Sequence, residues 1–181
     1  MLLTGRIRLK AQLNAVLIHA DGTRENYGDM EARKPWYQRF WEFMSFDERG
    51  LVTDAGLNFL AQNFTGETQD VSLFKFHDCG TGTTAAVQTD TALQTPAGTA
   101  RVSGTNTQTQ SASGTGSTTP AIVTSEGTIA FTSTLAITEW GLFSATSGVT
   151  MWDHRIFAAI NVVSGDSIQF TYSLSIPGGG T

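Results

Sequence analysis

The side chains best suited to acid–base or metal chemistry are three histidines and a single cysteine, namely His19, His77, His154 and Cys79. Asp153 directly precedes His154, and a carboxylate beside an imidazole can be interpreted as a catalytic dyad. However, no serine or cysteine nucleophile stands at a motif spacing from this pair, and neither Gly-x-Ser-x-Gly nor His-Glu-x-x-His occurs. We therefore interpret Asp153 and His154 as a polar pair on a sheet face, and we predict no catalytic residues and no enzymatic activity.

A glycine-rich segment surrounds His77 and Cys79. Gly80 and Gly82 invite a phosphate-loop interpretation, but no lysine follows them and no helical pattern opens behind them. His77 and Cys79 supply two metal ligands, with no plausible second pair in the chain. We predict a packed histidine and a buried thiol here, with no metal and no cofactor.

The elements that carry these residues read mainly as β-strands. From 168 to 176, apolar and small polar residues alternate, as in a strand with one buried face. The segment 150–159 also reads as extended, and the turn residues 164–166 between them predict an antiparallel hairpin. Two more strands are predicted at 128–135 and 136–143. The fold class expected is mainly β: an antiparallel β-sandwich or barrel-like domain with one or two short helices and an N-terminal β-hairpin and arm.

Between the N-terminal part and these strands, the pattern predicts one helix. Thr53 suits its N-cap and Gly66 its end. The apolar positions at helical spacing, which we expect to lie on the sheet, are Leu57, Leu60, Ala61 and Phe64. A further strand is predicted at 71–77. A long polar loop is predicted at 94–119, in which 105–110 forms an edge-type strand and 111–119 an exposed loop.

At the N-terminus, residues 6–18 alternate as a strand, although their apolar spacing also partly fits a helix. Asp21 and Gly22 favour a hairpin turn, with a return strand through 23–27.

The segment 31–46 is aromatic nearly all round, and Pro35 suits a first helical turn. Two interpretations stay open: a helix packed on its own domain, or an arm that docks on a neighbouring subunit. We divide the chain into 1–49, a hairpin and aromatic arm, and 50–181, the β-sandwich domain. The candidate partner-binding residues are Arg6, Arg8, Lys10, Trp36, Tyr37, Phe40 and Trp41.

Charged residues make up only 15% of the chain, well below the roughly 25% of ordinary soluble domains. Residues 1–49 hold eight of the eleven basic residues and seven of the sixteen acidic ones, so the remainder is strongly acidic. The basic N-terminal strand is either a solvated face or a contact with an acidic protein surface. Nucleic acid is disfavoured, because the chain as a whole is acidic and no basic run is interleaved with stacking aromatics.

A single cysteine rules out an internal disulfide, so we expect folding in a reducing cytoplasm. We expect no signal peptide, because polar and basic residues follow the first three at once. No apolar stretch approaches the roughly 18 residues of a membrane span.

Five short segments, in this order, resemble a family of small structural proteins from tailed bacteriophage virions. They are Leu51–Leu57, Phe76–Ala86, Asp90–Leu93, Ile137–Phe143, and Phe157 with Ser164–Ser167. The resemblance spans about 50–177 and does not extend clearly to 1–49. It carries over no catalytic residue.

The resemblance implies a component of the virion, assembled in the host cytoplasm. We expect a capsid decoration or cement protein that binds the major capsid protein as a homo-oligomer, a trimer matching the local symmetry of a capsid lattice. The alternative is a tail, head-fibre or adaptor component that binds a host glycan or receptor through loop 94–119, Trp140 and Trp152.

Overall fold

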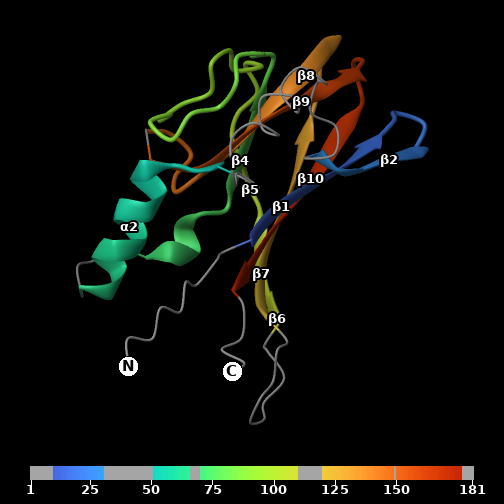
Figure 1. Ribbon diagram of the computed structural model, residues 1–181. Coiled ribbons are helices and arrows are strands. Elements are labelled where there is room, and N and C mark those ends of the chain that lie inside the picture. Colours follow the sequence, from blue (N-terminus) through green and yellow to red (C-terminus); the bar gives the residue numbers. More distant parts are fainter. Residues whose placement is uncertain (1–9, 31–50, 66–69, 110–119, 149, 177–181) are drawn as a thin grey trace, which may run out of the picture.

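The computed structural model describes residues 10–30, 51–65, 70–109, 120–148 and 150–176, and it confirms the predicted antiparallel β-sandwich (Figure 1). Sheet A contains, in spatial order, β2 (Arg24–Asp29), β1 (Lys10–Ile18), β10 (Ser167–Ile176), β7 (Ala121–Ala130) and β6 (Thr105–Thr109). Sheet B contains β3 (Leu51–Val52), β9 (Met151–Val162), β8 (Leu135–Phe143), β4 (Phe76–Gly80) and β5 (Val102–Ser103). The helix α2 (Asp54–Phe64) and the 3-10 turn η2 (Val71–Leu73) lie outside the sheets.

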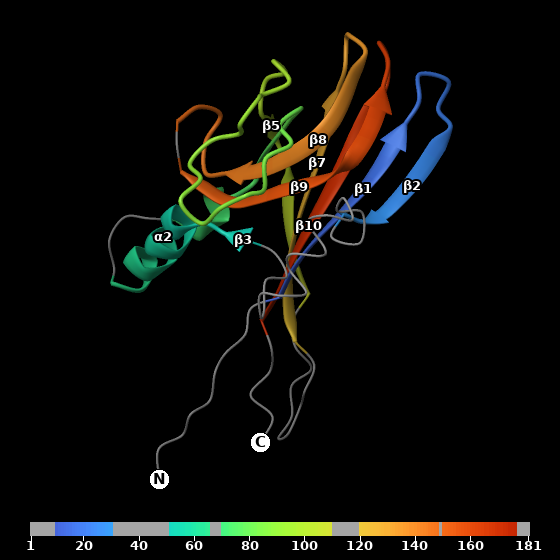
Figure 2. The same cartoon turned by 45° about the horizontal axis from the view of Figure 1, so that its top comes forward.

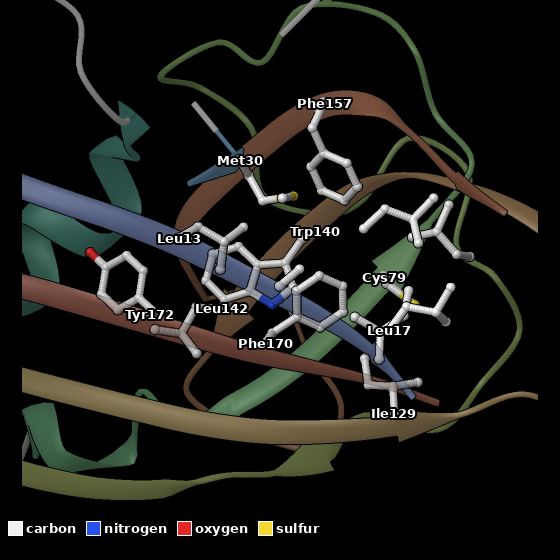
Figure 3. Close-up of a cluster of buried hydrophobic side chains, with 14 of the residues drawn as sticks. Leu13, Leu17, Met30, Cys79, Ile129, Trp140, Leu142, Phe157, Phe170 and Tyr172 are labelled. Atoms are coloured by element: carbon white, nitrogen blue, oxygen red, sulfur yellow. The ribbon is translucent and has the colours of Figure 1, made fainter. Parts of the chain in front are cut away.

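The core fills the space between the two sheets (Figure 3). On β10, Ile168, Phe170 and Tyr172 are at most 3% exposed, and the polar residues between them face outward, as the alternation predicts. From the opposite sheet, Trp140 is fully buried and stacks on Tyr172 with ring centroids 5.6 Å apart. Aromatic contact of this kind stabilises the sandwich beyond the area that it buries.

The N-terminal hairpin is confirmed for the described residues. β1 pairs with β2 in an antiparallel register, and Gly22 in the turn has a φ of +85°, which glycine adopts without strain. The helical alternative is therefore wrong for 10–18. β1 also pairs with β10 along its whole length and buries Leu13 and Leu17 in the common core.

The predicted hairpin between the last two strands is wrong. β9 and β10 both exist, but β9 pairs with β8 and β3 in sheet B, whereas β10 pairs with β1 and β7 in sheet A. The turn between them crosses from one sheet to the other. Gly165 there donates its N–H to Phe131 O, so this turn is joined to the β7–β8 turn, which crosses between the sheets in the same way.

Two segment boundaries also differ from those predicted. The strand predicted at 128–135 is β7, which begins at Ala121 and ends at Ala130, and the chain turns before β8. The strand predicted at 71–77 is instead η2 followed by β4, because the Asp70 carboxylate caps the turn by accepting the Ser72 N–H at 2.9 Å. The polar edge strand predicted at 105–110 is confirmed as β6. The predicted loop at 111–119 and the predicted aromatic segment at 31–46 lie outside the described residues. Of the longer loop predicted at 94–119, the structure describes 94–109, which contains β5 and β6.

The helix prediction is right in place and cap but wrong in orientation. Thr53 accepts the Gly56 N–H at 3.1 Å and donates its hydroxyl hydrogen to Met151 O, which joins the start of α2 to sheet B. The buried helix residues are Gly56 and Phe59. Of the four residues predicted to face the sheet, Leu60 does pack against the core, whereas Ala61 is exposed and Leu57 and Phe64 are 42% and 83% exposed. A Cβ at Gly56 would lie 3.0 Å from the Trp152 backbone, so the missing side chain lets this side of the helix approach the sheet. Figure 2 shows α2 beside β3, on the opposite side of the molecule from β2.

Candidate functional site

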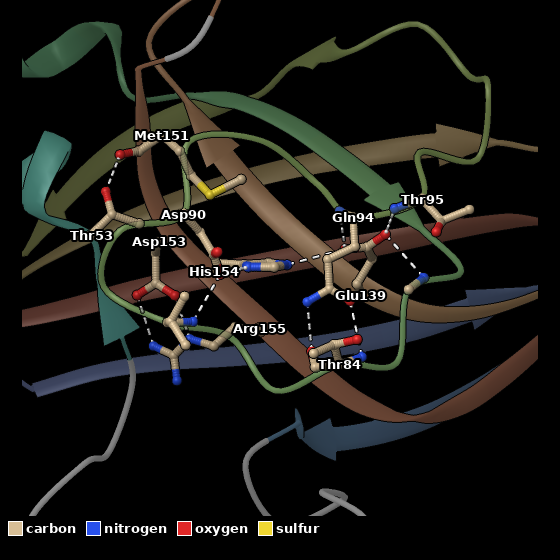
Figure 4. Close-up of polar contacts among 12 residues, drawn as sticks. Thr53, Thr84, Asp90, Gln94, Thr95, Glu139, Met151, Asp153, His154 and Arg155 are labelled. Carbon is tan, nitrogen blue, oxygen red and sulfur yellow. Dashed lines mark hydrogen bonds and ion pairs between the residues drawn. The ribbon is translucent and has the colours of Figure 1, made fainter.

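A group of charged side chains lies on the outer face of sheet B (Figure 4). His154 on β9 is held between two carboxylates. Its Nδ1 lies 2.7 Å from Asp90 Oδ2, and its Nε2 lies 3.1 Å from Glu139 Oε2 on β8. Asp90 belongs to the loop that follows β4. This loop covers His154 and Glu139 and excludes water from them. We call these three residues the His154 clamp.

Glu139 also holds the loop through its backbone. Its Oε1 accepts the N–H groups of Gly82 at 3.0 Å and Thr95 at 2.7 Å, and its Oε2 accepts that of Gln94 at 2.9 Å. A Cβ at Gly80 would lie 2.4 Å from Glu139 Oε1. The glycines thus let the loop backbone close around the protein's own carboxylate, which occupies the place that an external anion would take in a phosphate loop.

The charges of the clamp support one another. Burial by itself lowers the pKa of His154, but the adjacent carboxylates of Glu139 and Asp90 outweigh it, and this pKa lies above its ordinary value. Burial likewise raises the pKa of Glu139, but hydrogen bonds from His154 and the loop N–H groups bring it below its ordinary value. The two carboxylates therefore favour the imidazolium form of His154.

This arrangement fastens a loop to the sheet. Both ring nitrogens of His154 and both oxygens of Glu139 are engaged by protein groups. In the described part of the chain, no group of three or more His, Cys, Asp or Glu residues is arranged to hold a metal ion.

The predicted pair of Asp153 and His154 does not form. The two residues are neighbours on one strand, so their side chains point to opposite faces of sheet B. Asp153 instead binds Arg155, with Arg155 Nε 2.5 Å from Asp153 Oδ1 and Nη2 2.9 Å from Oδ2. Both side chains are at most 4% exposed. They lie near Tyr172, whose pKa is raised well above its ordinary value by burial and by the Asp153 charge.

His77 and Cys79 are the packed histidine and buried thiol that the sequence predicts, and both are completely buried. His77 lies between the sheets, where Trp140 Nε1 donates to its Nδ1 at 3.2 Å and Ser125 Oγ lies 3.1 Å from its Nε2. Since Nδ1 accepts, Nε2 carries the hydrogen and donates to Ser125. Burial lowers the pKa of His77 to about 4 and raises that of Cys79 to about 12.

Of the candidate partner-binding residues, only Lys10 lies in the described part of the chain. It is exposed at the start of β1, opposite Ser175 of β10. Arg6, Arg8, Trp36, Tyr37, Phe40 and Trp41 lie outside the described residues. The two tryptophans expected on a glycan-binding face are not available for stacking, because Trp140 is 0% and Trp152 5% exposed.

The structure also has an exposed apolar surface on α2 and η2. It is not evident from the sequence, because the helical pattern predicts that the apolar residues of α2 are buried. Leu57 and Phe64 lie two turns apart on α2, and Val71 and Leu73 of the adjacent η2 are 39% and 40% exposed. We call these four residues the α2–η2 surface. The helical spacing of Leu57 and Phe64 is visible in the sequence, but nothing local indicates which side of the helix faces solvent.

No helix among the described residues has the length and apolar character needed to cross a membrane. Comparison with family models, with curated proteins and with solved structures finds no match for this chain.

Proposed function

We propose that this protein is a structural component of a tailed-bacteriophage virion, a capsid decoration or cement protein that binds the major capsid protein as a homo-oligomer, with a trimer as the expected stoichiometry. The proposal rests first on the five segments that resemble such proteins. Four of them contain residues with a clear structural role, since Thr53 caps α2, Gly80 and Gly82 surround Glu139, and Asp90 completes the clamp. The resemblance thus concerns how the domain is built, and the particle-binding surface needs separate support.

The observation that supports a particular surface for binding the capsid shell is the exposure of Phe64. An aromatic side chain that is 83% exposed, on a helix adjacent to η2 and together with three further apolar residues that are about two-fifths exposed, is an unusual feature for a chain with so few charges. Aromatic side chains, phenylalanine included, are also enriched in the cores of protein–protein interfaces. We assign the α2–η2 surface to the contact with the capsid shell.

The test is co-sedimentation of the purified protein with shells assembled without it. Phe64→Ser should weaken binding at least about tenfold, because one buried aromatic anchor is worth on the order of 2 kcal/mol. Val163→Ser is the matched control, since Val163 is 52% exposed but lies in the β9–β10 turn, and it should bind like the unmodified protein. Failure of the unmodified protein to bind the shells would refute the proposed function. Normal binding by Phe64→Ser would refute only the assigned surface.

No observation favours the host-recognition alternative. The two aromatic residues it required are buried, and the remaining part of its expected site is polar loop.

A further inference from the structure

The two edges of sheet A differ in their protection against pairing with another strand (Figure 1). The β2 edge carries the charged residues Arg24, Glu25 and Asp29, and its pairing with β1 is interrupted by a register shift. Charges and bulges of this kind are the usual means of blocking an edge. The two edges of sheet B, β3 and β5, are only two residues long, which protects them as well.

The β6 edge lacks all of these features. Its sequence, Thr-Asn-Thr-Gln-Thr, has no charge, proline or glycine, and it pairs with β7 in an unbroken register from Thr105 opposite Glu126 to Thr109 opposite Ile122. No strand in the described residues pairs with its other side. Every β6 side chain is exposed except that of Asn106, whose amide donates to Ser72 O at 2.9 Å and steadies the strand.

The β6 sequence is complementary to itself. If two copies align antiparallel about Thr107, then Thr105 of one copy lies opposite Thr109 of the other. The two amide residues, Asn106 and Gln108, also lie opposite each other. Pairs of threonines across strands are favourable, and the absence of charge means that no like charges meet near the axis.

We propose that β6 is a self-association site, at which it pairs antiparallel with β6 of a second copy around a twofold axis through Thr107. The contact joins the two five-stranded sheets A into one continuous sheet and satisfies the main-chain groups of both edges. It does not depend on the proposed virion function. If the protein also forms the trimer proposed above, two such trimers joined by this contact make a hexamer, so the assemblies expected in solution contain an even number of chains.

Charge reversal at the axis tests the proposal in solution. Thr107→Lys brings two ammonium groups face to face and should weaken self-association at least about tenfold, as measured by sedimentation over a concentration series. An equimolar mixture of Thr107→Lys and Thr107→Glu should restore it, because opposite charges then meet. Thr128→Lys is the matched control: it makes the same change on the same face, on an exposed part of β7 beyond the end of β6, and should associate normally.

The register is tested by cysteine pairs oxidised with glutathione disulfide. Thr107→Cys should form a disulfide-linked dimer by itself. Thr105→Cys should do so only when mixed with Thr109→Cys, whereas the buried Cys79 provides no competing thiol. Either a monomer or a trimer at all concentrations would overturn the proposal, as would equal association of the Thr107→Lys and unmodified proteins or cross-linking of Thr105→Cys alone.

Discussion

The surroundings of His77 and His154 show that burial alone does not decide the charge of a side chain. Both histidines are at most 1% exposed, yet the pKa of His77 falls to about 4 and that of His154 rises. His77 faces Trp140 and Ser125, which are neutral partners, whereas His154 faces two carboxylates. One region is a neutral hydrogen-bonded part of the core, and the other is an ion cluster that fastens a loop to the outside of the same sheet.

Glu139→Gln should have the largest effect, because it removes the charge on which the His154 clamp depends. It leaves a buried imidazolium with one carboxylate partner and weakens the acceptor of three loop N–H groups. We expect the free energy of unfolding to fall by about 4 kcal/mol, in the range for breaking a buried ion pair. Urea denaturation followed by tryptophan fluorescence measures it. A loss below about 1 kcal/mol would mean that the clamp is not essential for stability.

The pH dependence of stability should show the next largest effect, and it should differ between the two histidines. His77 is neutral when folded, so below about pH 6.5 the unfolded state takes up a proton that the folded state does not. Stability should fall as the pH drops from about 6.5 to about 4, by up to about 3 kcal/mol. His77→Phe should remove this slope, although it also leaves two hydrogen-bonding groups unpaired. Persistence of the slope in the variant would assign it to other groups.

Within the clamp, His154 should act in the direction opposite to His77, whereas Glu139 should act in the same direction as His77. The raised pKa of His154 means that its contribution is fully present below about pH 6.5 and is lost as the pH rises through the folded value. The lowered pKa of Glu139 means that its contribution is present above about pH 4.5 and is lost as the pH falls through the folded value. His154→Gln should therefore abolish the loss of stability that the unmodified protein shows as the pH rises. Unfolding curves at closely spaced pH values compare the variant with the unmodified protein.

Ser125→Ala should have the smallest effect in this comparison. It removes the hydroxyl next to His77 Nε2 and leaves the rest of the side chain in place. We expect a loss of about 1–2 kcal/mol, the cost of leaving one buried donor without its partner. A result as large as that of Glu139→Gln would contradict the view that the His77 region is neutral.

Much of the local structure could be predicted from the sequence. The alternation at 168–176 identified β10 and its buried face, Asp21 and Gly22 located the β1–β2 turn, and Thr53 located the start of α2. Each of these depends on residues only a few positions apart, whose periodicity and backbone preferences act locally.

The partners of each element were decided only by the tertiary structure. β9 and β10 adjoin in sequence but lie in different sheets, because each buries its inner face best against the other across the core, as where Phe157 meets Phe170. Tertiary packing also decided which side of α2 is buried. The His154 clamp joins residues 15 and 64 positions apart, and no local pattern records that Asp90 and Glu139 will meet one imidazole. Packing and electrostatic interactions depend on distance in space, so the fold alone determined which buried histidine would carry a charge.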